Sequence, residues 1–174
     1  MIAARFLLAS TCVVALAACS DSGPGSDAGG DSPATTVALT GLCRLVTADH
    51  VTALFGPGYV LGDAEDSDAS CNYGVDTTEG GSRGRIYLGG SGISYDKTVE
   101  DSTALGQPMT DVAGLGSRAH FTADDSKQQY WIVIEDGTGS LSVLVQFKNG
   151  AVPPAEADLI AALTTLAEEY LAAV

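Results

Sequence analysis

Basic residues are scarce in this sequence. The 174 residues include 8 Lys and Arg against 22 Asp and Glu, which gives a formal net charge of −14. Nucleic-acid binding depends on clustered Lys and Arg that neutralise phosphates, and a polybasic hold on anionic lipid needs similar clusters. The composition therefore argues against both kinds of partner. The acidic surplus is explained by solubility, with a cation-binding or cationic-partner surface as the alternative.

The sequence also lacks the spaced motifs that identify common catalytic and cofactor sites. Gly89-Gly90-Ser91-Gly92 has neither the spacing nor the Lys-Ser/Thr end of a phosphate loop, and Gly114-Leu115-Gly116 lacks the third glycine of a dinucleotide fingerprint. Ser91 is followed at once by Gly92, so the Gly-x-Ser-x-Gly elbow of hydrolases is missing. We interpret both glycine runs as turns or bulges and predict no cofactor.

Metal-binding patterns are missing as well. His50 and His120 follow no zinc spacing, and we interpret them as ordinary surface histidines on a helix and at a strand end. The acidic cluster from Asp63 to Asp68 lacks the glycine and glutamate positions of a calcium-binding EF-hand loop. We therefore predict no metal site and a solvated loop over residues 63–70.

No transmembrane helix is predicted at the start of the chain, because the uncharged stretch from Phe6 to Ala15 is shorter than the roughly 20 residues that a span needs. It follows Arg5 and ends in small residues, which is the order of a secretory signal. Cys19 directly after Leu16-Ala17-Ala18 resembles the lipobox of bacterial lipoproteins. The resemblance implies a signal peptide over residues 1–18, a diacylglyceryl group on Cys19, and a lipid anchor on the extracytoplasmic face of the cell membrane. An ordinary signal peptide is the alternative.

Residues 19–40 consist mainly of Ser, Asp, Gly, Pro, Ala and Thr, with almost no apolar side chain before Val37. Such a segment cannot bury enough surface to offset its ordering entropy, so we predict a disordered tether after the lipidated cysteine. A flexible coil of this length reaches roughly 25 Å. The rest of the chain, residues 41–174, has the length of one domain.

Two cysteines remain for that domain, Cys43 and Cys71, because Cys12 lies in the signal and Cys19 carries the lipid. An even pair in an exported chain predicts a disulfide. A two-cysteine metal site is the alternative, but it lacks histidines at a suitable spacing. The loop-entropy relation gives the disulfide a stabilisation of about 3.6 kcal/mol.

Helix and strand patterns follow one another along the domain. Helices are predicted over residues 47–56, with Thr47 as N-cap, over 94–105, and from Pro153 onward. The last helix carries an apolar stripe that runs to Val174 and needs a partner. Strand patterns cover residues 71–75, 85–88, 112–121, 130–134 and 141–147. The predicted class is α+β, a single domain with an antiparallel sheet and helices packed on one face.

Aromatic residues on these strands suggest a ligand surface. Side chains alternate along a strand, so adjacent Tyr130 and Trp131 point to opposite faces. An antiparallel sheet can leave its second face concave and partly apolar. The alternative is that the aromatic rings fill the core or lie scattered. The candidate ligand-binding residues, with either arginine as polar anchor, are Tyr73, Tyr87, Arg85, Arg118, Tyr130 and Trp131.

Five segments of the domain carry a resemblance to known sequences: Cys43-Arg44-Leu45-Val46-Thr47, Val51–Gly56, Cys71-Asn72-Tyr73, Val112–Ala119 and the closing helix. With these segments the domain resembles a family of small actinobacterial cell-envelope lipoproteins, mycobacterial relatives among them, that carry a domain of unknown function. The family often has Trp two residues after the second cysteine, where this chain has Tyr73, and it supplies no catalytic residues.

These observations predict a membrane-anchored envelope lipoprotein that is a non-catalytic module for binding a ligand or a protein. The expected partners are the membrane, through the lipid anchor, and an envelope protein or a small lipid or glycan. The alternative function is an envelope hydrolase in which His50 or His120 belongs to a triad assembled only in three dimensions.

Overall fold

The computed structural model describes residues 41–124, 126–137 and 139–174. The predicted signal peptide, lipidated Cys19 and tether lie outside the described residues. The elements, in chain order, are η1 (Leu42–Leu45), α1 (Ala48–Phe55), β1 (Tyr59–Asp66), β2 (Ser70–Thr77), β3 (Ser82–Ser91), α2 (Tyr95–Ala104), β4 (Met109–Asp111), β5 (Ala119–Ala123), β6 (Gln129–Glu135), β7 (Ser140–Phe147) and α3 (Glu156–Ala173).

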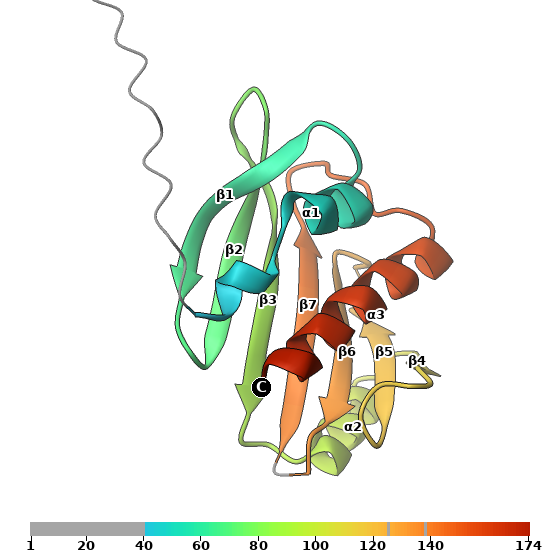
Figure 1. Cartoon of the computed structure of the whole chain (residues 1–174). Coiled ribbons are helices and arrows are strands. Elements are labelled where there is room, and N and C mark those ends of the chain that lie inside the picture. Colours follow the sequence, from blue (N-terminus) through green and yellow to red (C-terminus); the bar gives the residue numbers. More distant parts are fainter. Residues whose placement is uncertain (1–40, 125, 138) are drawn as a thin grey trace, which may run out of the picture. The chain divides into compact units, whose positions relative to one another are not determined.

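The strands form one antiparallel sheet in the order β1-β2-β3-β7-β6-β5-β4. The chain builds β1, β2 and β3 as neighbours, crosses through α2 to the far edge at β4, and returns strand by strand to β7. There β7 pairs with β3 in the middle of the sheet (Figure 1). The predicted α+β class with an antiparallel sheet is confirmed.

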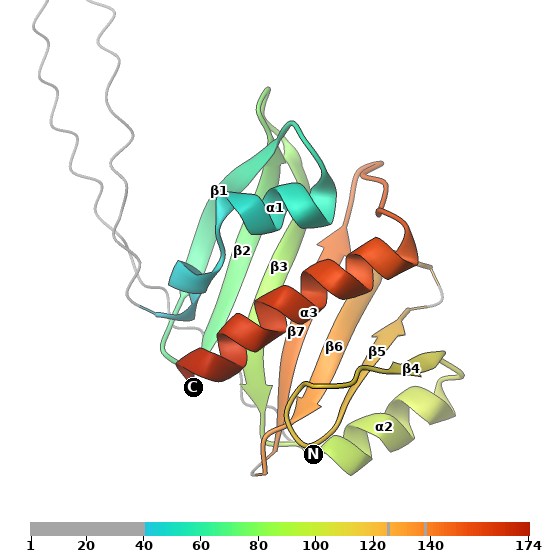
Figure 2. The same ribbon diagram turned by 45° about the vertical axis from the view of Figure 1, so that its right-hand side comes forward.

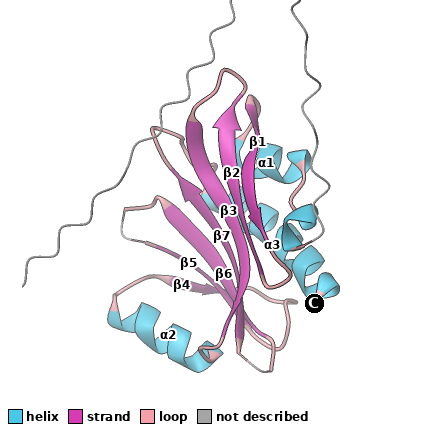
Figure 3. Ribbon diagram, turned by 90° about the vertical axis from the view of Figure 1, so that its left-hand side faces the viewer, coloured by secondary structure: helices cyan, strands magenta, loops and turns pink. Residues whose placement is uncertain are grey.

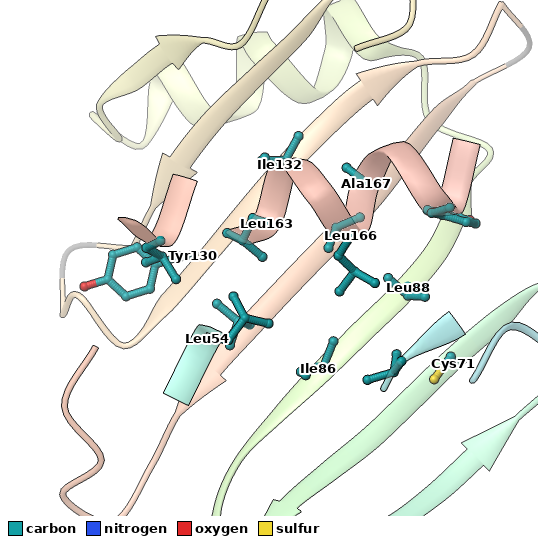
Figure 4. Packing of buried hydrophobic residues seen from close by; sticks show 14 of the residues in the cluster. Leu54, Cys71, Ile86, Leu88, Tyr130, Ile132, Leu163, Leu166 and Ala167 are labelled. Carbon is teal, nitrogen blue, oxygen red and sulfur yellow. The ribbon is translucent and has the colours of Figure 1, made fainter. Parts of the chain in front are cut away.

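Helices α1 and α3 lie on one face of the sheet, and α3 crosses its central strands diagonally (Figure 2). Helix α2 lies on the opposite side, at the end of the sheet near β4 and β5 (Figure 3). The core is formed between the sheet and helices α1 and α3 (Figure 4). Its labelled side chains are Leu54, Cys71, Ile86, Leu88, Tyr130, Ile132, Leu163, Leu166 and Ala167.

Helix α3 buries the predicted stripe from Leu159 to Tyr170, and each fully buried leucine contributes roughly 1.5–3 kcal/mol. The stripe ends there, because Val174 is 69% exposed. The helix also begins at Glu156 rather than at the predicted Pro153. A residue that precedes proline is disfavoured in the helical region, and Pro153 precedes Pro154. Within the described ranges, no helix has the length and apolarity needed to cross a membrane.

The acidic segment expected to be a loop over residues 63–70 is partly a strand. β1 continues to Asp66, which pairs with Cys71, so the turn shrinks to residues 67–69. Pairing with β2 outweighs the low strand propensity of Asp and Glu, and side chains such as Asp63 and Glu65 remain solvated on this edge strand. Charged edge residues also oppose sheet-to-sheet association.

Residues 112–121, expected to be one interrupted strand, divide into a loop over residues 112–118 and the first part of β5, which begins at Ala119. Gly114 and Gly116 have φ values of +91° and +56°, which break the extended backbone. Leu115 between them is 2% exposed, so its side chain fixes the loop to the core. Leu115, one of the apolar residues that suggested a strand, is thus buried although it lies in a loop.

Cys43 in η1 and Cys71 in β2 form a disulfide with their Cα atoms 4.8 Å apart. The carboxylate of Asp66 accepts hydrogen bonds from the backbone N–H groups of Gly41 (2.9 Å) and Cys43 (2.8 Å). A Cβ atom at Gly41 would lie 2.3 Å from the carbonyl oxygen of Ser67, so glycine is required at this contact. The start of the domain is thereby fastened to β2 and to the β1–β2 turn.

Candidate binding face

The sheet face opposite α1 and α3 is uncovered over β2, β3 and β7 within the described part of the chain (Figure 3). Alternation along β3 sends Ile86 and Leu88 into the core and turns Arg85 and Tyr87 to the other side, where they are half-buried. We call this uncovered surface the open face.

Strand register aligns the open-face residues in rows across the sheet. Asn72 of β2 pairs with Tyr87 of β3, Tyr87 pairs with Leu144 of β7, and Leu144 pairs with Trp131 of β6. Two strand spacings therefore separate the backbones of Tyr87 and Trp131, about 10 Å. The neighbouring row consists of Gly74, Arg85, Gln146 and Gln129.

Two adjoining hollows follow these rows. They share Tyr87, Gln129 and Leu144, and we call them together the groove. Volumes of about 510 and 290 Å³ bring the groove into the range of small-ligand sites. The larger hollow is lined by Glu65, Ser70, Asn72, Arg85, Tyr87, Gln129, Leu144 and Gln146. The smaller is lined by Tyr87, Gln129, Trp131, Ser142 and Leu144.

Gly89 shapes the groove by making room for the ring of Tyr87. A Cβ atom at Gly89 would lie 2.1 Å from the Tyr87 hydroxyl and 2.5 Å from Cζ. The ring therefore runs along β3 over the glycine. Without a side chain at position 89, Tyr87 can lie against the strand and leave the groove open above it.

Arg85 makes fewer side-chain contacts than three other basic residues, Lys97, Arg118 and Arg83. Lys97 bonds to two carboxylates and so does Arg118, while Arg83 donates to the carbonyl of Asn149. Arg85 has no ion pair and no side-chain hydrogen bond among the described residues, and its cross-strand neighbours are Gly74 and Gln146. The groove therefore holds a half-buried guanidinium with unused donors.

The structure brings together three of the six residues that the sequence suggested for a ligand site: Arg85, Tyr87 and Trp131. Tyr73 pairs with Ile86 on the helix-covered face, and Tyr130 is 6% exposed in the core. The sequence argument missed the amide and hydroxyl groups of the groove. Alternation along β7, with Ser142, Leu144 and Gln146 on one side, was the signal that would have found part of them.

Arg118, the other predicted anchor, lies outside the groove. It donates hydrogen bonds to Glu135 (2.9 and 2.7 Å) and Asp96 (2.8 Å), and its guanidinium lies 4.5 Å from the ring centre of Tyr95. Hydrogen bonds from Arg118 first, and from Ser117 second, lower the pKa of Glu135 to about 2. Arg118 thus joins α2 to β6.

His50 is buried, 7% exposed, so its assignment to the surface is wrong. Packing of α1 against α3 covers it. Its Nδ1 accepts the backbone N–H of Thr47 at 3.2 Å, in a capping box, and its Nε2 lies 3.5 Å from Glu169 of α3. The Thr47 hydroxyl is also 3.1 Å from Nδ1, and a cleft of about 410 Å³ adjoins the group.

His120 is buried as well, at 2% exposure, because α2 covers this end of the sheet. Its Nδ1 lies 3.1 Å from the hydroxyl of Tyr95, and its Nε2 has no hydrogen-bond partner within the described structure. Burial lowers the pKa of His120, and the nearby Asp111 opposes this in part. Burial beneath α2 therefore disfavours the protonated imidazole.

Among the residues that the structure describes, no cluster of His, Cys, Asp and Glu is suited to hold a metal ion. Comparison of the chain with protein-family models, curated proteins and solved structures finds no match.

Proposed function

We propose that this chain is a lipid-anchored protein of the cell envelope, and that the open face of its sheet is a non-catalytic surface for binding a ligand. The single observation that carries the binding function is the groove. Two aromatic side chains, several amides and an arginine that has no partner among the described residues converge there, on a face that no described helix covers.

The anchoring part of the proposal rests on the sequence. Arg5, the apolar stretch after it and Cys19 follow the order of a lipoprotein signal. A disulfide between Cys43 and Cys71 suits an oxidising compartment outside the cytoplasm. Two acyl chains on one cysteine would anchor the protein stably, where a single chain holds only marginally.

The binding part rests on the chemistry of the groove. Ligand sites are typically concave, with aromatic surface and a few polar groups that fix orientation. Tyr87 and Trp131 supply the aromatic surface, and Arg85 supplies donors that the described protein leaves unused. A purely structural spacer has no need of such a surface.

The hydrolase alternative has its best support at His50, which approaches both Thr47 and Glu169. Helix capping accounts for this geometry. The Nδ1 atom that would take a proton from the Thr47 hydroxyl already accepts the Thr47 backbone N–H, and the hydroxyl accepts the His50 backbone N–H at 3.4 Å. We therefore favour the non-catalytic function.

Photo-crosslinking in cells that make the full chain tests the proposal. A photoreactive amino acid is placed at Gln129 or Ser142 in the groove, and at Glu168 on the exposed side of α3 as the matched control. The expected result is a discrete adduct from the groove positions that the control does not give. The binding function is contradicted by groove positions that give no adduct, or the same adducts as Glu168.

A further inference from the structure

We infer that the groove binds an acidic glycan, a saccharide with a sparse carboxylate or phosphate substituent, whose anion pairs with Arg85 while its sugar rings lie on Tyr87 and Trp131. The inference rests on the proposed binding function and adds the class of ligand.

The presence of an anionic group on the ligand is inferred from Arg85. In a chain with 22 acidic and 8 basic residues, a half-buried arginine would be expected to find a carboxylate. Lys97 and Arg118 each bond to two, yet Arg85 bonds to none among the described residues. A guanidinium presents a planar fork that fits carboxylate or phosphate, and partial burial strengthens that pairing. We therefore expect the ligand to supply the anionic group that pairs with Arg85.

The saccharide part of the ligand is inferred from the other side chains that line the groove. A sugar ring has one face of C–H groups, which packs on an aromatic ring, and a rim of hydroxyls, which both donate and accept hydrogen bonds. Tyr87 and Trp131 offer the rings. Amides and hydroxyls that donate and accept surround them, namely Asn72, Gln129, Gln146, Ser70 and Ser142.

Two other ligands fit less well. Leu144 is the one aliphatic side chain lining the two hollows, and an acyl chain would leave the amides, the hydroxyls and Arg85 beside the two rings without hydrogen-bond partners. An extended peptide is usually recognised along a sheet edge, where backbone groups are free, whereas the groove lies across the middle strands. An acidic peptide is therefore not favoured by this geometry.

The charge of the whole chain limits how acidic the glycan is. The net charge of −14 repels a polyanion, although at physiological salt charges beyond about 8 Å are largely screened. Glu65 at the edge of the groove accepts a hydrogen bond from Asn72 at 3.1 Å and adds a local negative charge. One anion near Arg85 is favoured, and a densely sulfated chain is not.

Fluorescence titration of the purified full chain tests the inference, because Trp131 is the single tryptophan and lies in the groove. The probes are a tetrasaccharide of alternating glucuronic acid and N-acetylglucosamine, a neutral N-acetylglucosamine tetrasaccharide, and the same neutral tetrasaccharide carrying one phosphate. We expect at least one acidic probe to bind roughly tenfold more tightly than the neutral one, the usual gain from a charged hydrogen bond.

The variant Arg85→Gln is expected to remove this preference, while Lys97→Gln, which loses the same charge on α2, retains it. Equal binding of neutral and acidic probes would overturn the acidic-ligand inference and leave the proposed function standing. Failure of all three probes to bind would overturn the inference that the ligand is a glycan. Crosslinking from Gln129 and Ser142 would then test the proposed function separately. A preference that survives Arg85→Gln would also overturn the inference.

Discussion

The ring of Tyr87 lies over Gly89, two residues further along β3, at a distance that leaves no room for a methyl group on the glycine. The atom that would be struck is the hydroxyl at the end of the tyrosine side chain, which can move, and the backbone of Gly89 is not in the left-handed region. Gly89 therefore controls the position of an aromatic ring without itself offering any group to a ligand.

The variant Gly89→Ala is expected to fold and to lift Tyr87 away from β3. The affinity for the acidic tetrasaccharide that binds most tightly should then fall by about fivefold or more. Gly90→Ala is the matched control, because a Cβ at Gly90 meets its nearest atom, on Leu141, at an ordinary 3.6 Å. Fluorescence titration gives the affinities, and thermal unfolding reports the fold. Equal affinities for the two variants would contradict the proposed role of Gly89.

Trp131 is expected to contribute a large share of the binding free energy in the groove. Trp131→Ala should weaken ligand binding by at least about 1 kcal/mol, while Trp131→Phe, which retains a ring, should lose less. Calorimetry measures both, since neither variant retains tryptophan fluorescence. Unchanged affinity in a folded Trp131→Ala variant would remove this residue from the site.

Loss of the disulfide should destabilise the domain. The double variant Cys43→Ala/Cys71→Ala is expected to lower the free energy of unfolding by about 3.6 kcal/mol, because the unfolded chain regains the freedom of the closed loop. Denaturant unfolding measures the change, and wild type in reductant should approach the same value. Two reactive thiols at positions 43 and 71 in denatured, unreduced wild type would show that the bond does not form.

Stability should fall on mild acidification because of His120. Its pKa is lowered from 6.5 in the folded chain, first by burial, so the unfolded chain binds more protons just below that pH. The contribution of His120 to the free energy of unfolding therefore rises with pH across this window. It is fully present above the unfolded pKa and is lost as the pH falls toward the folded pKa. Tyr95 of α2 and Asp111 of β4 are the titratable groups nearest to the imidazole.

Denaturant unfolding at about pH 7.5 and about pH 5.5 tests this linkage. The wild type should lose more stability between the two than His120→Gln, because glutamine takes up no proton. A pH dependence that is identical in the two proteins would show that His120 is not the responsible group.

Cys19 should decide where the protein is found. Cys19→Ala removes the sulfur atom that is predicted to carry the lipid. The variant is expected to be released from the membrane or to remain unprocessed. Cys12→Ala is the matched control, because it removes a cysteine from the apolar stretch of the signal and leaves the lipobox intact. A Cys19→Ala variant that fractionates with membranes as wild type does would contradict the anchor.

Local signals predicted part of the fold well. Thr47 and Gly56 delimit α1 as their chemistry requires, and Ser94 is the N-cap of α2. The β-branched and aromatic runs on either side of the 136–139 turn form β6 and β7. In each case the residues that determine the structure are adjacent in sequence, so a single chain segment carries the information.

Features that depend on distant partners were harder to predict. β1 is a strand because β2 lies beside it, and the acidic composition of the segment around Asp63 obscured this. His50 and His120 are buried by α3 and α2, elements far from them in the sequence. Arg85 and Arg118 looked alike as anchors. Arg118 is paired with carboxylates and Arg85 is not, and this difference became visible only from the positions of the carboxylates in the described ranges.

The fastening of Cys43 and Asp66 determines how the domain would carry a mechanical load. A pull on Gly41 passes first to the Asp66 carboxylate and then through the sulfur–sulfur bond into β2, which is an inner strand of the sheet. Residues 44–70 lie within the covalent loop and cannot be drawn out while that bond is intact. Resistance to extension from this end therefore begins at Asp66, the last residue of β1, and continues at β2, which is held on its two sides by pairing with β1 and β3.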